Sequence, residues 1–319
     1  MDWETADTDL GGIDIENSTY RITTDQFIEP LVASIEGVGL LNPPFLLPTG
    51  GRYTIVSGFR RVAAYLQLGH IDIPARVLKP EIPGPLVAKI AICENSSERP
   101  LNLVETSRSL HLLARHVEDP LKLEQACRRL GLPDHPSMRK KIMRVCRMPV
   151  SIQEGILEDV ISLNTALMLD DLGTEAGLIL ADIFRNLHLS YSKQREILTH
   201  LVEITRRDKI SPGTFLEDAQ LHALLCDPEK SSAQKVNMLR HHFRSHRFPF
   251  LTLAQESFLK ESRKLSLGDN IRLRAPSGFE SPEYVFTIGI KNLSDLETGI
   301  KVLQTALHNP ALKNILTRS

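Results

Sequence analysis

The sequence predicts an α+β fold in three parts: a small mixed α/β N-terminal domain, a central all-helical domain and a small α+β C-terminal segment. Two observations lead to this prediction. Short apolar strands alternate with helices over residues 18–95, whereas the periodicity from Leu103 to about Leu225 is helical nearly throughout. A strand pattern returns only near Ile271. We place the domain boundaries at 1–17 (a flexible acidic arm), 18–102, 103–228 and 229–319.

Composition excludes several classes of protein. The chain has 319 residues, of which 42% are apolar, so it can bury a substantial core. The formal net charge is −1, so any nucleic-acid surface must come from local clustering. We find no stretch typical of a membrane span or signal peptide, and expect a cytoplasmic protein. The four cysteines lack metal-site spacing and are expected to be reduced core thiols.

The N-terminal domain is predicted from an ordered series of short elements. A helix follows Phe27 and stops at Gly37 or Gly39, where glycine ends helices readily. The remaining elements are strands over 45–48, 53–56 and 71–78 and helices over 59–65 and 86–92. Prolines at 80, 83 and 85 separate the last strand from the last helix.

The most informative turn joins the strand 53–56 to the next helix. Ser57-Gly58 ends the strand, and Arg60 and Arg61 lie in the first turn of the helix. Glycine allows close approach of the backbone, unpaired N–H groups open the helix, and forked guanidinium donors suit phosphate oxygens. This pattern predicts an anion site. The alternative is an ordinary strand–turn–helix with surface arginines.

Two boxes at a fixed separation resemble the ParB/RepB family of partition proteins. They read SGFRRVAAYLQLG from Ser57 and ENSSERPLNLVE from Glu94, and the resemblance covers residues 13 to about 170. It implies that the domain binds CTP with Mg²⁺ and acts as a DNA clamp. The resemblance implies a nucleotide site formed by Arg21, Gly58, Arg60, Arg61, Ala64, Glu94, Asn95 and Arg99, with Glu94 beside the metal.

Two departures from the family boxes lead us to expect little catalysis. Phe59 stands where the family commonly has glutamate, and Glu98 occupies the slot of an arginine that here falls one residue late, at Arg99. Glu94 is the one candidate catalytic residue, with Glu98 and Glu105 as helpers. CTP hydrolysis is therefore expected to be slow or absent. The alternatives are a nucleotide-hydrolysing or nuclease enzyme, or an adaptor without ligand.

A helix–turn–helix is predicted at about 121–148. A helix closed by Gly131 is followed by a turn in which Ser137 is the expected N-cap, and then by a basic helix to Met148. Residues 122–147 hold eight Lys and Arg against two acidic residues. The apolar residues expected to face inward are Met138, Ile142, Val145 and Cys146. The residues expected to face DNA are Ser137, Arg139, Lys140, Lys141 and Arg144. The alternative is a solvated charged face.

The C-terminal half carries two further patterns. His242 and His246 lie one helical turn apart among arginines, which favours an anion-facing surface over a zinc site because no Glu or Cys stands at ligand spacing. Strands over 271–274 and 284–290 precede a helix that Ser294 to Glu297 should cap and that ends near Leu307. Two strands make a marginal sheet, so we expect it to pair with a second chain or dock on the helical domain.

These observations together predict a DNA-binding partition or regulatory protein, with CTP as the regulator that the resemblance implies. Its expected partners are double-stranded DNA, a second copy of the chain and a partition ATPase, and its expected place is the nucleoid. No membrane partner is expected.

Overall fold

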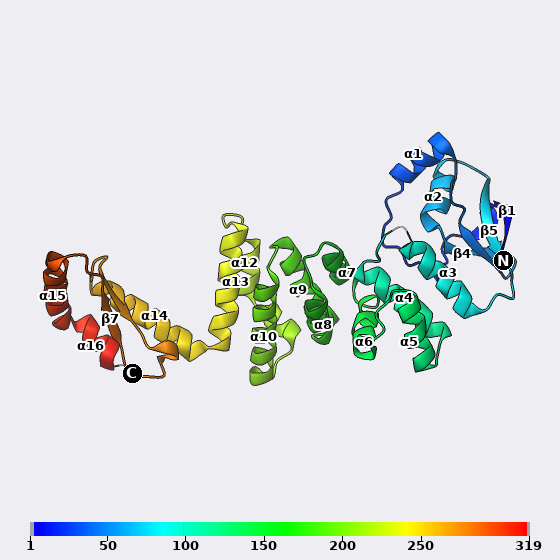
Figure 1. Ribbon diagram of the computed structural model, residues 1–319. Helices are drawn as coiled ribbons and strands as arrows, with labels where there is room; N and C mark the ends of the chain where they lie inside the picture. The colour runs from blue at the N-terminus through cyan, green and yellow to red at the C-terminus, as the bar shows by residue number, and fades with distance from the viewer. Residues whose placement is uncertain (1–2, 98, 318–319) are drawn as a thin grey trace. The chain divides into compact units, whose positions relative to one another are not determined.

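The computed structural model describes residues 3–97 and 99–317, and it divides the chain into two compact units, Met1–Tyr191 and Ser192–Ser319 (Figure 1). The first unit contains a five-stranded mixed sheet of order β1-β5-β3-β4-β2. The strands are β1 (Trp3–Asp9), β2 (Ile13–Asp14), β3 (Phe45–Thr49), β4 (Arg52–Ser57) and β5 (Asp72–Leu78). A short 3₁₀ turn, η1 (Leu10–Gly12), joins β1 to β2.

Helices cover both faces of this sheet. They are α1 (Glu29–Val38), α2 (Phe59–Gln67) and α3 (Gly84–Ser96). Because side chains alternate across a strand, Ile55 packs with α1 and α2 while its neighbour Val56 packs with α3. Leu46 and Phe45 of β3 divide in the same way. The sheet is therefore a central layer, as its nearly continuous apolar strands require.

The N-terminal segment corrects one expectation. Residues 1–17 were expected to form a loose arm, but Trp3–Asp9 is a strand that pairs antiparallel with all of β5. Arg76 of β5 lies 5.4 Å from the ring centroid of Trp3, which fastens the start of the strand. The strand is held by backbone hydrogen bonds to β5, which do not depend on its acidic side chains. The acidic sequence therefore gave no sign of a strand. Residues 1 and 2 lie outside the described residues.

The remainder of the first unit is helical. It consists of α4 (Leu103–His116), α5 (Pro120–Arg129), α6 (Pro136–Val145), α7 (Val150–Leu157), α8 (Leu163–Asp171) and α9 (Thr174–Asn186). Asn102 caps α4 in a capping box with Glu105, which fixes the start of this helix locally. Leu110 and Leu113 of α4 join the same apolar cluster as Ile92 of α3, so α4 is anchored to the N-terminal domain.

The second unit begins with helices and ends with a small sheet. Its helices are α10 (Tyr191–Asp208), α11 (Pro212–Leu216), α12 (Ala219–Cys226), α13 (Ser232–Arg247), α14 (Pro249–Lys264), α15 (Leu293–Leu307) and α16 (Pro310–Thr317). The two antiparallel strands are β6 (Ile271–Arg274) and β7 (Val285–Ile288), with the turn η2 (Ser277–Phe279) between them.

Three expectations for the C-terminal segment are corrected or extended. Asn292, not Ser294, caps α15, because its side chain accepts the N–H of Asp295. A further helix, α16, follows α15 and packs Leu312 and Ile315 against Leu273 of the sheet. The two-stranded sheet thus finds its core within its own unit, while pairing with a second chain stays a prediction.

The cysteines and the helices bear on two further expectations. All four cysteines are free, but Cys93 and Cys226 are exposed, so the expectation of core thiols is wrong for these two. Cys127 is buried as expected. Within the described part of the chain, none of the helices combines the length and apolarity needed to cross a bilayer.

Candidate functional site

The predicted anion turn has the backbone that its sequence indicates. Gly58 caps α2 with φ of 93°, in the left-handed region that favours glycine. A Cβ at this position would lie 2.7 Å from Cβ of Pro44, so a side chain cannot be accommodated without a shift. No side chain caps α2, which leaves the N-terminal end of its dipole open.

Arg61 joins the two sequence boxes. Its Nη1 donates to the carbonyls of Asn42 and Pro43 at 2.8 and 3.1 Å, and its Nη2 lies 3.6 Å from Oε2 of Glu94. That carboxylate oxygen is buried and has no hydrogen-bond partner among the described residues. The boxes predicted to share a site therefore meet in space, at a carboxylate whose acceptor is unsatisfied.

Arg60 points to the other side of the turn. Its guanidinium forms an ion pair with Asp25 at 2.8 Å and donates to the carbonyl of Phe27. Its Nε is buried and has no hydrogen-bond partner among the described residues. Both arginines are thus partly engaged by protein groups and retain polar atoms near them that a ligand could satisfy.

Phe59 replaces the family carboxylate with a ring that the structure uses for packing. The side chain is buried, and the guanidinium of Arg21 lies 5.4 Å from the ring centroid. Arg21 is therefore placed beside the turn, as the resemblance implies. Ala64 is also buried, on the side of α2 that packs into the core, and it offers no polar group to a ligand.

The second box divides its residues between two roles. Asn95 donates from Nδ2 to the carbonyl of Ala91 at 2.7 Å, within α3. Arg99 donates from Nη1 and Nη2 to the two carboxylate oxygens of Glu105, at 2.8 and 2.7 Å. Glu98 lies outside the described residues. Arg99 thus turns toward α4 at this point of the chain.

Glu105 is the centre of a satisfied network. The side chain is 1% exposed and accepts from the backbone N–H and the hydroxyl of Thr24, from the N–H of Asn102 and from Arg99. Burial raises the pKa of this carboxyl, but the hydrogen bonds from Arg99, Thr24 and Asn102 outweigh that effect and hold the pKa below its usual value. The network ties the segment after Arg21 to the start of α4.

A polar cavity of about 400 Å³ lies next to Arg21. Its lining includes Arg108, His111 and Arg115 of α4, which sequence reasoning missed. Their spacing of three and four residues on one helix face was the available signal. Arg21, Arg108 and Arg115 bring positive charge together along this cavity. Burial lowers the pKa of Arg108, and the neighbouring charge of Arg21 lowers it further.

The helix–turn–helix region requires two corrections. His135, not Ser137, is the N-cap of α6, because Pro136 already occupies its first position. Arg139 was expected to face outward but is 7% exposed, and its guanidinium donates to the carbonyl of Asp134. Met138 was expected inside and is exposed. In the first turn of α6, the buried position is therefore Arg139, one residue later than the expected Met138.

The other predicted DNA-facing residues differ in availability. Arg144 donates from Nε to Asp170 at 2.9 Å and pairs with Asp171 at 2.6 Å, so α8 engages it. Ser137 is exposed and bonds to His135 at 2.9 Å. Lys140 and Lys141 are exposed, and neither takes part in an ion pair within the described residues.

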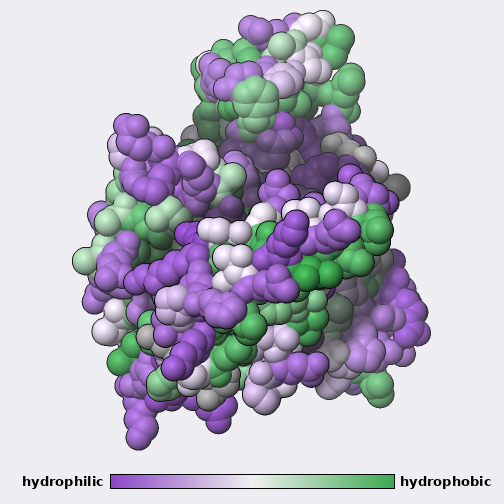
Figure 2. Space-filling view, turned by 90° about the vertical axis from the view of Figure 1, so that its left-hand side faces the viewer, coloured by the Kyte–Doolittle hydropathy of each residue, from purple (hydrophilic) through white to green (hydrophobic). Residues whose placement is uncertain are grey.

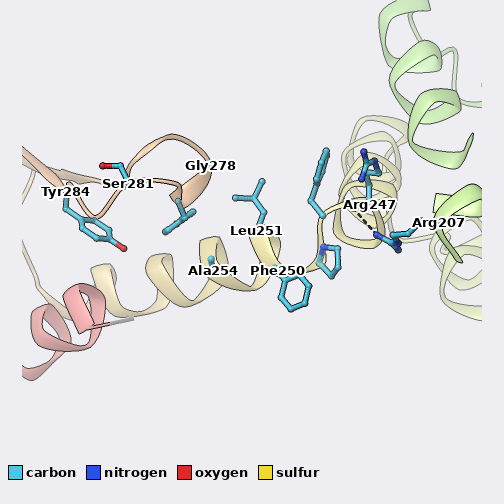
Figure 3. Close-up of a pocket in the computed structure, with 11 residues that line it drawn as sticks. Arg207, Arg247, Phe250, Leu251, Ala254, Gly278, Ser281 and Tyr284 are labelled. Atoms are coloured by element: carbon cyan, nitrogen blue, oxygen red, sulfur yellow. Dashed lines mark hydrogen bonds between the residues drawn. The ribbon is translucent and has the colours of Figure 1, made fainter. Parts of the chain in front are cut away.

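A further cavity lies within the second unit, with a volume of about 700 Å³. Figure 3 shows Leu251 and Ala254 of α14 beneath the loop that carries Gly278 and Ser281. Tyr284, which precedes β7, lies beside a later turn of α14. Its walls are largely apolar, and the cationic side chains at one end, Arg207 and Arg247, belong to α10 and α13. No residue predicted for the nucleotide or DNA lines it.

Comparisons with known proteins identify the domain. Residues 14–96 match the model of the ParB N-terminal domain. The chain is 30% identical over 140 residues to stage 0 sporulation protein J of Bacillus subtilis, covering 44% of this chain and 48% of that protein. It is 29% identical over 178 residues to the nucleoid occlusion protein of Halalkalibacterium halodurans, covering 54% and 60%. The chain therefore spans about half the length of the curated relatives it matches.

Two solved structures of ParB from Caulobacter crescentus are also similar. One is complexed with CTP-γ-S, with 23% identity, a TM-score of 0.27 and coverage of 57% of this chain and 98% of that one. The other is complexed with the centromeric parS site, with 21% identity, a TM-score of 0.33 and coverage of 59% and 96%.

The fold and the sequence match define a protein with a mixed-sheet domain joined to a helical region. Residues 14–96 match the ParB N-terminal domain family, and the chain is distantly similar to chromosome-partitioning and nucleoid occlusion proteins.

Proposed function

We propose that this chain is a DNA-binding partition or regulatory protein whose N-terminal domain binds CTP with Mg²⁺ at the turn of Gly58. The single observation that carries the proposal is the meeting of Arg61 with Glu94, because it unites the two family boxes beside an uncapped helix start. The likeness to a ParB crystallised with CTP-γ-S is consistent with this choice of nucleotide.

The residues at the turn fit a nucleotide and a metal ion. Arg60 and Arg61 would hold phosphate oxygens, and Arg21 would approach from the cavity side. Glu94 would face the metal ion, which accepts carboxylate oxygen readily and would coordinate Oε2, the oxygen without a hydrogen-bond partner among the described residues. The bound ion would neutralise phosphate charge. We propose that Arg99 positions α4 through Glu105 and acts on the ligand only indirectly.

The nucleotide acts in this proposal as a conformational ligand with weak or no hydrolysis. Phe59 supplies no carboxylate at the turn, and Glu105 is fully engaged in its network. A ligand shifts a conformational equilibrium only by its differential affinity for the two states. The alternative, an enzyme of the same superfamily, would need Glu94 to act alone.

DNA binding is assigned to α6 and its surroundings. Lys140 and Lys141 are the available cations, and they would contact phosphates. Arg139 and Arg144 would hold α6 in place through their contacts with Asp134 and Asp170. A partition ATPase partner and a nucleoid location belong to the same proposal, and the similarity to nucleoid occlusion proteins supports the location.

The proposed homodimer uses the C-terminal segment. Figure 2 views the chain from the side on which Figure 1 shows the C-terminal segment, and apolar surface is visible there among hydrophilic side chains. The exposed apolar residues of β7, α15 and the loop between them are Val285, Ile290, Leu293, Ile300 and Leu307. Sedimentation of the full chain should show a dimer, and a monomer at micromolar concentration would contradict this part of the proposal.

Calorimetric titration with CTP tests the nucleotide site. The wild-type chain should bind CTP in the presence of Mg²⁺, and Arg61→Ala should weaken binding by about ten- to a hundredfold, the effect of about 1.5–3 kcal/mol for a charge-assisted contact. Arg52→Ala is the matched control, because Arg52 donates to the carbonyl of Ile13 away from the turn. Equal affinity in Arg61→Ala and the control, or no CTP binding by the wild type, would contradict the site.

A further inference from the structure

Helix α13 carries two imidazoles on the side that meets α12. His242 and His246 are one helical turn apart, and their ring centroids are separated by 4.5 Å. Asp218, the N-cap of α12, reaches the same place, with Oδ2 3.3 Å from Nε2 of His242. One ligand atom from each of these three residues lies within 4.8 Å of the other two.

The central imidazole is buried and incompletely satisfied. His242 is 8% exposed, and its Nε2 has no hydrogen-bond partner among the described residues. An imidazole binds a metal ion through a ring nitrogen, and Nε2 is the nitrogen of His242 that faces Asp218. A buried nitrogen at ion-pair distance from a carboxylate, without hydrogen-bond alignment, is an observation that itself points to a cation between them.

The distances suit a small transition-metal ion. Tetrahedral zinc with bonds of about 2.0–2.1 Å to nitrogen and oxygen places its ligand atoms roughly 3.3 Å apart. The pair Asp218–His242 already has this separation. His246 is exposed, so a side-chain rotation can complete the set.

The surroundings fix the ligands in place. The ring of Phe215 lies 5.8 Å from that of His242 and 5.3 Å from that of His246, and forms an apolar wall. Arg207 donates to the main-chain carbonyl of His246 at 2.9 Å and to that of Arg247 at 3.1 Å, and Figure 3 shows the second of these contacts. They secure the end of α13. Supporting contacts of this kind orient metal ligands in known sites.

The arginines interleaved with the histidines are engaged elsewhere. Arg240 donates to Glu196 at 2.9 Å, and Arg247 forms an ion pair with Glu203. Both glutamates belong to α10, so these cations are neutralised by another helix. The sequence favoured an anion surface because a carboxylate ligand was missing at helical spacing, and the fold supplies that carboxylate from Asp218.

We propose that Asp218, His242 and His246 bind one divalent transition-metal ion, with zinc favoured by its ligand preference, that joins the start of α12 to α13. Two imidazoles and one carboxylate suit zinc, and the remaining coordination position would be filled by water. This site is independent of the nucleotide proposal, because all three ligands lie in the second unit.

The test uses the full chain without a histidine tag, treated with chelator and dialysed free of metal. Calorimetric titration with Zn²⁺ should give one equivalent, and binding should raise Tm. His246→Ala and Asp218→Asn should each weaken binding by at least about tenfold, since even outer-shell partners matter this much. Asp218→Asn keeps the helix cap, because the Oδ1 that accepts the N–H of Gln220 is retained.

His241→Ala is the matched control. His241 precedes the cluster on the same helix and lies 3.7 Å from Glu256, outside the ligand set. It should bind Zn²⁺ as the wild type does. With Co²⁺ as the probe, the visible bands of a low-coordinate site should appear in the wild type and be lost in His246→Ala. Absence of stoichiometric Zn²⁺ binding by the wild type, or equal binding by all three variants, would overturn the site.

Discussion

Two arginine–glutamate pairs in the first unit have the same chemistry and different surroundings. Arg61 and Glu94 are 3.6 Å apart, and an oxygen of Glu94 is buried without a hydrogen-bond partner among the described residues. Arg99 and Glu105 form a bidentate pair at 2.7 and 2.8 Å, and Glu105 accepts three further hydrogen bonds. The second pair is complete, whereas the first has an acceptor left for a ligand.

This difference separates carboxylates that only stabilise the fold from carboxylates that can still bind a ligand. A buried carboxylate that accepts from backbone and side chain on every side stabilises the fold and has no lone pair left for chemistry. A buried carboxylate with an unsatisfied oxygen costs stability unless something binds there. The contrast indicates that Glu105 stabilises the fold, and it supports our proposal that Glu94 faces a ligand.

The largest expected effect comes from Glu105→Gln. The substitution removes the charge and turns an amide toward the donors of Arg99 and Thr24, so the free energy of unfolding should fall by about 2–3 kcal/mol. Denaturant unfolding measures this. Glu118→Gln, at an exposed position, should change stability by less than about 0.5 kcal/mol. If Glu105→Gln changed stability as little as Glu118→Gln does, Glu105 would not be a structural carboxylate, and the contrast with Glu94 would fail.

The same substitution has a defined pH dependence. The pKa of Glu105 is lowered in the folded state, so its contribution is complete above the unfolded value of about 4.3 and is lost as the pH falls through the folded pKa. The stability difference between wild type and Glu105→Gln should therefore narrow below about pH 4. A difference that stays constant down to pH 3 would contradict the lowered pKa.

Helix α6 offers a second contrast between structural and available cations. Lys140→Gln with Lys141→Gln should weaken binding to all duplexes and reduce the salt slope by about 0.9 for each phosphate that is no longer neutralised, without lowering Tm. Arg139→Gln should instead lower Tm, because its buried guanidinium holds the carbonyl of Asp134. Filter binding over several salt concentrations, with thermal unfolding, separates the two. Salt-independent binding would exclude α6 as the DNA-binding element.

The smallest expected effect concerns turnover. Phe59→Glu restores the common family box and places a carboxylate near Arg21, which lies 5.4 Å from the present ring. Phosphate release from CTP should rise slightly above a baseline near zero and should still require Glu94. Phe59→Leu is the control, because it removes the ring without adding a carboxylate. Robust hydrolysis by the wild type would favour the enzyme alternative over a conformational ligand.

The sequence predicted the features that depend on local backbone rules. The turn at Ser57-Gly58 was predicted to end a strand and open a helix, and Gly58 lies between β4 and α2 with φ of 93°, in the region that favours glycine. Gly39, one of the two predicted stops, is the C-cap of α1. The strand at Trp3–Asp9 was missed because its pairing with β5 is a tertiary contact that no periodicity shows.

The candidate sites were predicted less completely, for the same reason. The phase of α6 depends on what its first turn packs against, and an error of one residue exchanged Met138 with Arg139. Asp218 lies far from His242 along the chain, so the metal cluster appears only once α12 and α13 meet. Residue types indicate chemistry, and packing decides which of them are available.

The thermal shift produced by CTP and Mg²⁺, measured side by side for wild type, Glu94→Gln and Glu105→Gln, tests the account most directly. A ligand present at a hundred times its Kd adds about 2.7 kcal/mol to stability, so the wild-type Tm should rise clearly. Glu94→Gln should keep the ligand-free Tm and lose most of the shift, whereas Glu105→Gln should lower the ligand-free Tm and keep a shift. A ligand-free Tm lowered equally by both substitutions, or a shift abolished only in Glu105→Gln, would contradict the account.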